Sequence, residues 1–170
     1  MHWTEALMKD PAGAAILDNL RSAKFIISPD DFHRADIAPR MEWRSVRFDQ
    51  AEQANLPTEP GLYAFVVRVN FPGLPPNGWV LYIGQTGHGT SAGTLRSRFG
   101  QYLKEKKKLK RHSVFFMLNA WDGALEFFYT PLPSRKAELV ELETELLGAF
   151  RPPFTDRTYP ATYMSPRHAF

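Results

Sequence analysis

Two tyrosines in short apolar runs are the first side chains of this sequence that could act together in a reaction. Tyr63 ends the tripeptide Gly61-Leu62-Tyr63, and Tyr82 begins the tripeptide Tyr82-Ile83-Gly84. Residues 70–78, between the two runs, are dense in Pro, Gly and Asn. This pattern predicts two neighbouring antiparallel strands. Two phenol groups, each able to donate and accept a hydrogen bond, could therefore meet across one small sheet.

A guanidinium and a carboxylate follow on two segments that we predict to be helices. Apolar residues recur at helical spacing over residues 95–103, with Thr94 as the N-cap, so Arg98 and Tyr102 project from the same helix face. A second apolar stripe over residues 139–150 places Glu143 beside its buried edge. A carboxylate in such a position is costly unless it is paired or bound to a cation.

Taken in order, these elements resemble the GIY-YIG nucleases, a family of homing endonucleases, the first-incision subunit of bacterial excision repair and some restriction enzymes. The family pattern is a Gly-Ile-Tyr strand, a Tyr-Ile-Gly strand and a Leu-x-x-Arg helix with His or Tyr four residues after the Arg. A later helix with Leu-Glu-x-x-Leu-Ile and a Pro-x-x-Asn segment complete it. The corresponding segments here lie between residues 58 and 157 and include Leu95–Arg98, Tyr102, Leu142–Leu147 and Pro152–Thr155.

Two positions depart from that family pattern. Leu62 replaces its isomer Ile in the first strand, and Thr155 stands where Asn is usual. In the family this Asn braces the site by hydrogen bonding, and a Thr hydroxyl has fewer donors and less reach than an Asn amide, which puts catalytic competence in question. The adjacent Asp156 could compensate. Each motif is weak alone, and their order and spacing carry the resemblance.

The resemblance implies an α+β fold in which a small three-stranded antiparallel sheet is flanked by helices. We expect this nuclease-like domain over residues 58–157, after an N-terminal extension at 1–57 and before a C-terminal tail at 158–170. The third strand should lie at residues 125–129, whereas residues 114–118 could form a strand or a helix. Within the extension we expect a helix at 14–20, a strand at 24–27, a turn or the start of a helix at 28–31 and an edge strand within 41–48.

The resemblance also implies a mechanism, the metal-dependent hydrolysis of phosphodiester bonds in DNA. Glu143 would hold a single Mg²⁺ or Mn²⁺ ion, and Arg98 would donate to the non-bridging phosphate oxygens. Tyr82 would relay the proton of the attacking water, Tyr63 would position it or share that role, and Tyr102 would hold the phosphate or the nucleophile. A tyrosine pKa near 10 is high for a base at pH 7, so cationic neighbours or a metal-bound water must help. The supporting residues would be Gly61, Gly84 and Thr155.

A basic segment directly follows the helix that carries Arg98. Six of the nine residues 104–112 are Lys or Arg, dense enough for a local positive patch beside a polyphosphate strand. Such a run can also be only a solvated helix end. The candidate nucleic-acid contacts are Arg96, Lys104, Lys106, Lys107, Lys108, Lys110 and Arg111, and Arg151 and Arg157 could extend the surface.

Composition limits the class of protein without identifying it. The chain has 170 residues, 44% of them hydrophobic, a net charge of +3 and a pI of about 9.2, as expected for a mildly basic folded domain. It contains no cysteine, which excludes disulfides, a thiol nucleophile and a Cys-based zinc site. We see no membrane-spanning run and no signal-peptide pattern, and we therefore expect a cytoplasmic protein.

A second class of function stays open from sequence. The chain could be a catalytically weak or inactive GIY-YIG module that binds nucleic acid or scaffolds a partner, and RNA is an alternative to DNA. The tyrosines could be core residues, and Arg98 and Glu143 could form an ion pair between helices. Glu145 is the alternative carboxylate if the helix register differs, and the lone His88 in a glycine-rich loop is most simply solvated.

Overall fold

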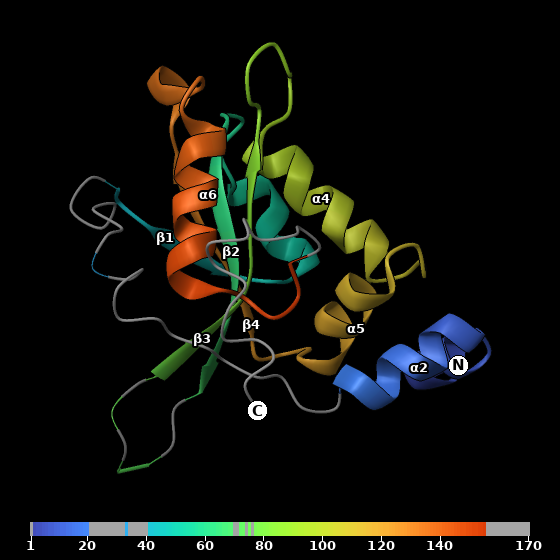
Figure 1. Cartoon of the computed structure of the whole chain (residues 1–170). Coiled ribbons are helices and arrows are strands. Elements are labelled where there is room, and N and C mark those ends of the chain that lie inside the picture. Colours follow the sequence, from blue (N-terminus) through green and yellow to red (C-terminus); the bar gives the residue numbers. More distant parts are fainter. Residues whose placement is uncertain are drawn as a thin grey trace.

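Among the residues that the structure describes, four strands form one antiparallel sheet (Figure 1). The computed structural model describes residues 2–20, 33, 41–69, 72–73, 75 and 77–155. The strands are β1 (Arg44–Arg47), β2 (Gly61–Val69), β3 (Asn77–Thr86) and β4 (Leu125–Pro131), in the spatial order β1-β4-β2-β3. The three strands predicted from the apolar runs correspond to β2, β3 and β4.

The α+β class is confirmed, but the sheet has four strands where three were expected. The additional strand, β1, lies within the segment treated as an extension and pairs with β4 from Arg44↔Tyr129 to Arg47↔Glu126. Three of its four side chains are exposed and only Val46 is half-buried. An edge strand with so little burial has a weak apolar alternation, so its pattern could not indicate that it joins this sheet.

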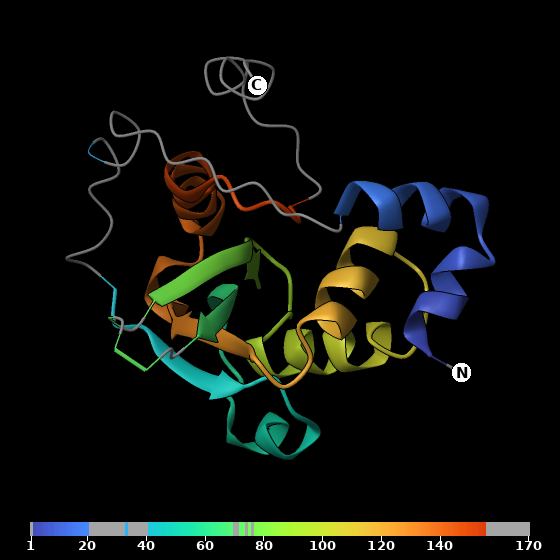
Figure 2. The same ribbon diagram turned by 90° about the horizontal axis from the view of Figure 1, so that it is seen from below.

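Helices cover both faces of the sheet. α6 (Leu139–Phe150) lies on one face, and α4 (Leu95–Glu105) and α5 (His112–Ala120) lie on the other (Figure 2). α1 (Trp3–Met8) and α2 (Pro11–Leu20) form an outer pair, with α2 against α5. Short 3-10 turns occupy Gln50–Asn55 and Pro133–Arg135. The ambiguous segment 114–118 is therefore helical, and the predicted helices at 14–20, 95–103 and 139–150 are confirmed.

The helix that carries Arg98 begins at the predicted cap. The Thr94 hydroxyl accepts a hydrogen bond from the Ser97 amide at 3.1 Å, and the Ser97 hydroxyl accepts one from the Thr94 amide at 2.9 Å. This capping box satisfies two backbone donors at the start of α4. The expected stripe of Leu95, Phe99 and Tyr102 is buried against the sheet, which fixes the rotation of the helix and the direction of Arg98.

Two hydrophobic clusters lie on opposite faces of the sheet. The cluster towards α4 and α5 is rich in aromatic rings, among them Tyr63, Phe65, Phe99 and Phe127. The cluster towards α6 is mainly aliphatic and includes Leu62, Ile83, Leu142 and Leu146. Because successive residues of a strand point to opposite faces, β2 supplies Tyr63 and Phe65 to the first cluster and Leu62 and Ala64 to the second.

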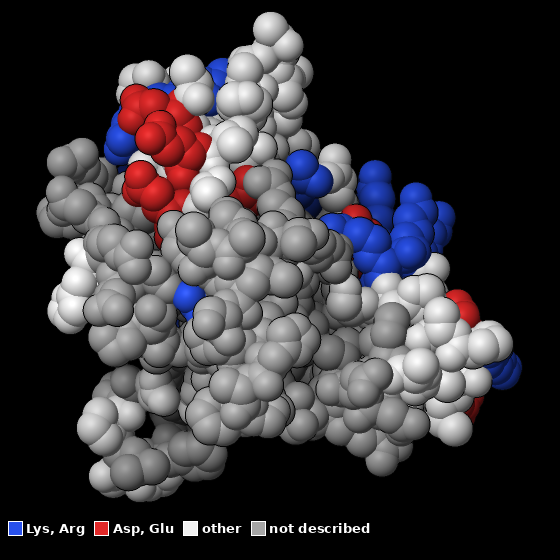
Figure 3. Space-filling model, in the orientation of Figure 1, with Lys and Arg blue, Asp and Glu red and all other residues white. Residues whose placement is uncertain are grey.

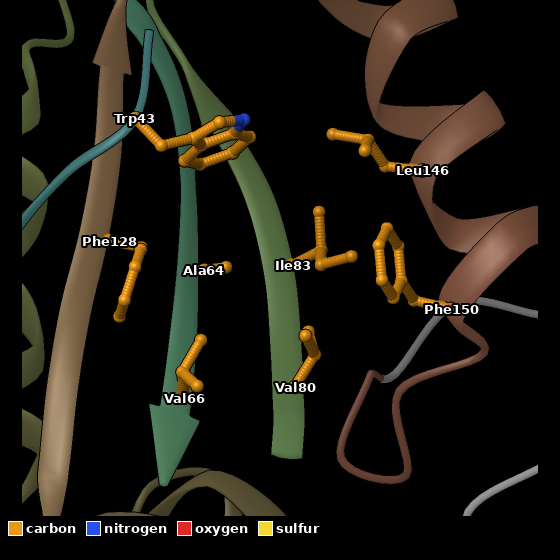
Figure 4. A pocket seen from close by; sticks show the side chains of 8 residues that line it. All are labelled: Trp43, Ala64, Val66, Val80, Ile83, Phe128, Leu146 and Phe150. Atoms are coloured by element: carbon orange, nitrogen blue, oxygen red, sulfur yellow. The ribbon is translucent and has the colours of Figure 1, made fainter. Parts of the chain in front are cut away.

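An apolar cavity of about 340 Å³ lies between the sheet and α6 (Figure 4). Trp43, Ala64 and Phe128 line its sheet side, and Leu146 and Phe150 face them from α6. Its walls offer almost no hydrogen-bonding groups, so this cavity has none of the side chains that catalysis by acid, base or metal requires.

Several expectations fall on residues outside the described ranges. These are the strand at 24–27, the turn or helix start at 28–31, the tail at 158–170, and Asp156 and Arg157. In the part of the chain that is described, no helix is both long enough and apolar enough to cross a lipid bilayer. The domain boundaries proposed from sequence stay a prediction.

Candidate active site

Regular pairing between β2 and β3 places the second tyrosine on the face of the first. Tyr63 pairs with Gly84 and Phe65 with Tyr82, so Tyr82 shares a face of the sheet with Tyr63 and Phe65. Val66 then pairs with Val80, so Leu81 is an extra residue on β3. This β-bulge lets Leu81 pack on the aromatic face beside Tyr82, although strict alternation would place the two on opposite faces.

Three tyrosine side chains meet on this face. The Tyr63 and Tyr82 rings stack at 6.3 Å between centroids and 15° between planes. The Tyr102 ring, from α4, meets both of them edge-on, at 5.8 Å from Tyr63 and 5.9 Å from Tyr82. The Tyr63 and Tyr102 hydroxyl oxygens are 3.0 Å apart and share a hydrogen bond. We call Tyr63, Tyr82 and Tyr102 the tyrosine cluster.

Members of the tyrosine cluster differ in their access to solvent. Tyr63 is 2% exposed and Tyr102 is also buried, whereas Tyr82 is half-buried. Burial raises the pKa of Tyr63 far above its usual range, and the Tyr82 phenol adds to this, while the charge of Arg98 opposes it. Burial, and then the Tyr63 and Tyr82 phenols, raise the pKa of Tyr102. Tyr63 and Tyr102 therefore stay neutral, and Tyr82 is the member that a substrate can reach.

Glycines at the two motifs allow close approaches. A Cβ on Gly84 would lie 2.4 Å from the Tyr63 hydroxyl oxygen, so this phenol lies directly against the backbone of β3. A Cβ on Gly61 would lie 2.2 Å from the Thr130 carbonyl oxygen, which shows how tightly β2 approaches β4 at its first residue. Gly84 thus leaves room for the Tyr63 phenol, and Gly61 for the close pairing of β2 with β4, while the supporting role that the resemblance implied for both stays a prediction.

Arg98 lies on α4, and its charge acts on the Tyr63 phenol. The side chain is half-buried, and its Nη1 donates to Gln101 Oε1 at 2.9 Å. Its Nε is buried and makes no hydrogen bond to any of the described residues. Part of the guanidinium is thus held in place by Gln101, and a donor remains for an anion.

Glu143 is buried at 4% exposure, as its place beside the apolar stripe predicted. Its charge contributes to the raised pKa of Tyr63, so the carboxylate of α6 acts on the tyrosine cluster from across the edge strand. Figure 1 shows β3 running between α6 and α4, which carry Glu143 and Arg98. Its neighbours Glu141 and Glu145 are exposed, as expected, and the helix register that singles out Glu143 is therefore correct.

Thr155 lies beyond α6, on a segment that returns to the edge strand. The Phe154 amide donates to the Leu81 carbonyl oxygen at 3.1 Å, and the Phe154 ring is buried against Phe116. The Thr155 hydroxyl is buried and has no hydrogen-bond partner among the described residues. The closing segment of the family pattern, Pro152–Thr155, thus lies beside β3. The Thr155 hydroxyl nevertheless makes no hydrogen bond that would brace a described side chain of the site.

Glu143 is the candidate metal ligand beside the tyrosine cluster. No group of three or more His, Cys, Asp or Glu side chains in the described part of the chain could hold a metal together. Mg²⁺ fits such a position because it commonly keeps several waters and binds through one or two carboxylates plus substrate phosphates. Glu143 is the carboxylate at the tyrosine cluster that suits it.

The basic residues predicted to contact nucleic acid fall into two groups. Three of them are engaged in the fold: Arg96 Nε donates to the Leu56 carbonyl oxygen at 2.7 Å, Lys106 pairs with Asp122 at 2.6 Å, and Arg111 pairs with Glu105 at 2.6 Å. In the second group the side chains are exposed and make no ion pair or hydrogen bond with a described residue. This group consists of Lys104, Lys107, Lys108 and Lys110.

Arg111 has a structural position that its sequence context did not reveal. Its guanidinium carbon lies 5.5 Å from the centre of the Tyr102 ring, and the same guanidinium donates twice to Glu105. A cation above a tyrosine face is attracted by the ring. Tyr102 thereby has contacts with both Arg111 and Tyr63, and the contact with Arg111 requires the α4–α5 turn to fold back.

Two further residues differ from the sequence-based picture. Arg151, proposed to extend the basic surface, is 5% exposed and ends α6 with a φ of 43°, so it cannot join that surface. His112, which the sequence does not single out, donates a hydrogen bond from its Nε2 to the Asp10 carboxylate at 2.7 Å. That contact joins α5 to the start of α2, and only the tertiary structure could reveal it.

Known proteins give no independent assignment. No protein-family model, curated protein or solved structure matches this chain. The likeness to GIY-YIG nucleases therefore stays a prediction, and we infer the function from the residues of the chain itself.

Proposed function

We propose that this protein is a metal-dependent endonuclease that hydrolyses phosphodiester bonds in DNA. The observation that supports this most is the convergence of one half-buried and two buried tyrosines with Arg98 at the edge strand, within electrostatic reach of Glu143. A phosphoryl transfer needs a cation for the phosphate oxygens and a group that takes the proton of the attacking water. These residue types supply both functions.

The division of roles follows from burial. Arg98 donates to the non-bridging phosphate oxygens, because its guanidinium is only half-buried and has further Nη donors besides the one that Gln101 accepts. Tyr82, the half-buried member of the tyrosine cluster, takes the proton of the attacking water in its phenolate form and so returns to the neutral phenol. Tyr63 and Tyr102 stay protonated and fix the ring of Tyr82 through stacking and edge contacts. A Mg²⁺ or Mn²⁺ ion held by Glu143 would supply Lewis-acid stabilisation of the phosphate charge.

The test is cleavage of supercoiled plasmid with Mg²⁺, with Mn²⁺ and with EDTA. We expect metal-dependent nicking that Glu143→Gln, Arg98→Ala and Tyr82→Phe each slow by roughly 10²-fold or more, as for loss of one charge-stabilising group. Glu145→Gln is the matched control, because Glu145 is an exposed glutamate on the same helix. Absence of cleavage with either metal, or a Glu143→Gln variant as active as the wild type, would overturn the proposal.

A pH profile separates the proton-transfer role from a structural one. A general base acts in its deprotonated form, so cleavage that uses Tyr82 as the base should accelerate as the pH rises. Tyr82→Phe should lose that dependence together with the activity. A flat profile between about pH 7 and pH 9 would contradict the role of Tyr82 as the base.

A second candidate is an inactive module that binds nucleic acid, and the isolated Thr155 hydroxyl favours it. In that case the wild type should bind DNA without cleaving it, and Glu143→Gln should leave binding unchanged. Thr155→Asn provides the discriminating variant, because an amide has both a donor and an acceptor to brace its neighbours. Cleavage gained by Thr155→Asn alone would identify Thr155 as the defect.

A further inference from the structure

A pocket lined by lysines lies where α4 turns towards α5. Its volume is about 270 Å³, and its lining residues are Gln101, Lys104, Glu105, Lys108 and Lys110. Figure 3 shows Lys and Arg side chains gathered over this turn, whereas Asp and Glu gather over α6. We call this feature the lysine pocket.

The lysine pocket carries a positive charge that the described residues do not neutralise. Lys104, Lys108 and Lys110 are exposed and have no ion pair with a described side chain. The one carboxylate in the lining, Glu105, accepts two hydrogen bonds from Arg111, at 2.6 Å and 3.1 Å. Because Arg111 compensates Glu105, three lysines line one hollow whose carboxylate is already paired. Such a concave cationic site favours an anion with several oxygens.

Gln101 links the lysine pocket to the candidate active site. Its Oε1 accepts a hydrogen bond from Arg98, the residue assigned to the phosphate that is cleaved, and the same residue lines the pocket. Along the α4 axis Lys104 lies about 9 Å beyond Arg98, at 1.5 Å per residue. One strand of B-DNA rises about 3.4 Å per nucleotide along the duplex axis, and because it also winds around that axis its neighbouring phosphates lie roughly twice as far apart. A single strand could therefore meet Arg98 and the pocket with two different phosphates.

We propose that the lysine pocket binds a backbone phosphate of the DNA strand that is cleaved, about one to two nucleotides from the scissile phosphate. The strand then runs along α4, from the tyrosine cluster to the α4–α5 turn. This inference rests on the proposed function, because Arg98 defines the scissile position. It assigns the basic residues unequally: Lys104, Lys108 and Lys110 hold a phosphate, while Lys106 and Arg111 maintain the fold.

The first experiment measures DNA binding in EDTA, so that cleavage plays no part. The dissociation constant of a short duplex is followed across salt concentrations for the wild type, Lys104→Ala, Lys108→Ala and Lys107→Ala. Lys107 is the matched control, since it is exposed and equally charged but does not line the pocket. Loss of one phosphate contact should reduce the slope of the logarithm of the binding constant against the logarithm of the salt concentration, the salt slope, by about 0.9. It should also weaken binding about eightfold at 0.1 M salt. Lys107→Ala should retain the wild-type slope, and equal effects of all three substitutions would overturn the inference.

The second experiment locates the contacted phosphate. Duplexes carrying one neutral methylphosphonate are scanned through the positions flanking the cleaved bond. A neutral linkage about one to two nucleotides away should weaken wild-type binding but have little further effect on Lys108→Ala. A sensitive position elsewhere, or the same sensitivity in both proteins, would contradict the strand path.

Inorganic phosphate distinguishes a backbone contact from a site for a free anion. We expect it to bind weakly, to be displaced by the duplex, and to be lost in Lys108→Ala. Tight phosphate binding that the duplex does not displace would overturn the proposal in favour of a free-anion site. Reduced slopes in a protein that does not cleave plasmid would refute the nuclease alone, whereas unchanged slopes with intact cleavage would refute the lysine pocket alone.

Discussion

The two faces of the sheet use the same strands but different kinds of side chain. Towards α4 and α5, rings from β2, β3 and β4 pack edge-to-face or stacked, and the Phe65 ring alone contacts four others within 6.3 Å. Towards α6, aliphatic side chains predominate and a cavity of about 340 Å³ remains. One face is therefore closely packed around ionisable phenols, and the other is loosely packed and almost without polar groups.

This difference indicates why the candidate site lies at the edge strand. A phenol can act on a substrate with defined geometry only if its ring is immobilised, and the interlocked rings of the aromatic face provide that support. The face towards α6 contributes one charged group at the same edge, Glu143. The site thus combines the rigidity of one face with a carboxylate from the helix that covers the other.

The largest expected difference between the faces is in the cost of removing a ring. Phe65→Ala should lower the free energy of unfolding by about 3–5 kcal/mol, because Phe65 is 0% exposed and the neighbouring rings cannot collapse into the cavity that its ring would leave. Phe128, the next residue on β4 after Phe127, is half-buried on the opposite face and serves as the control. Chemical denaturation should show a clearly smaller loss for Phe128→Ala, and equal losses would remove the distinction between the faces.

On the face towards α6, truncation should cost less than burial alone suggests. Leu146 lines the cavity, so its side chain lacks packing partners on one side, and Leu146→Ala should cost about 2 kcal/mol, the low end for a buried leucine. Leu118, which is fully buried in the aromatic cluster, is the matched control. Denaturant midpoints in which Leu146→Ala is the more damaging substitution would show that the cavity closes in solution.

Apolar spacing predicted much of this arrangement, and long-range contacts account for what it missed. The strands around Tyr63 and Tyr82, the cap at Thr94 and the buried place of Glu143 all follow from local patterns. Local periodicity could not identify the partner of β1, nor decide between strand and helix for 114–118, where apolar residues are continuous. The resemblance to a nuclease family supplied the roles of the site residues, which spacing alone does not indicate.

The ion-pair partners of the basic residues could not be predicted from the sequence, for a related reason. The basic segment shows its lysines as equivalent, but Lys106 pairs with Asp122, sixteen residues later, across the α5 helix and its following turn. Arg111 reaches back to Glu105 only because the chain folds between α4 and α5. Which cations remain available for a ligand is therefore a property of the tertiary structure.

The aromatic face should also make stability depend on alkaline pH. Tyr63 has a raised pKa in the folded protein because of burial, whereas its pKa in the unfolded chain is about 10. The folded state therefore holds its proton more tightly, so stability is unaffected below about pH 10 and falls above it, by about 1.4 kcal/mol per pH unit for one phenol. Tyr63→Phe should make this decline shallower by that amount, measured by urea unfolding across the pH range.

The same variant has a neutral-pH consequence that checks the interpretation. Loss of the Tyr63 hydroxyl removes its hydrogen bond to Tyr102 and should cost about 1 kcal/mol at pH 7. Tyr129→Phe offers a comparison within the same hydrophobic cluster. An alkaline decline that is as steep in Tyr63→Phe as in the wild type would show that Tyr63 is not the group responsible.

The smallest expected effect is a gain in stability on the loosely packed face. Ala64 points from β2 into the cavity, so Ala64→Val adds two methyl groups to unfilled space and a β-branched side chain to a strand. We expect the free energy of unfolding to rise by about 0.5–1 kcal/mol, as for other cavity-filling changes. Ala149 is equally buried but does not line the cavity, so Ala149→Val should instead destabilise by about 1–3 kcal/mol through overpacking. Opposite signs for the two alanines in thermal or chemical denaturation would establish that the free volume is confined to the face between the sheet and α6.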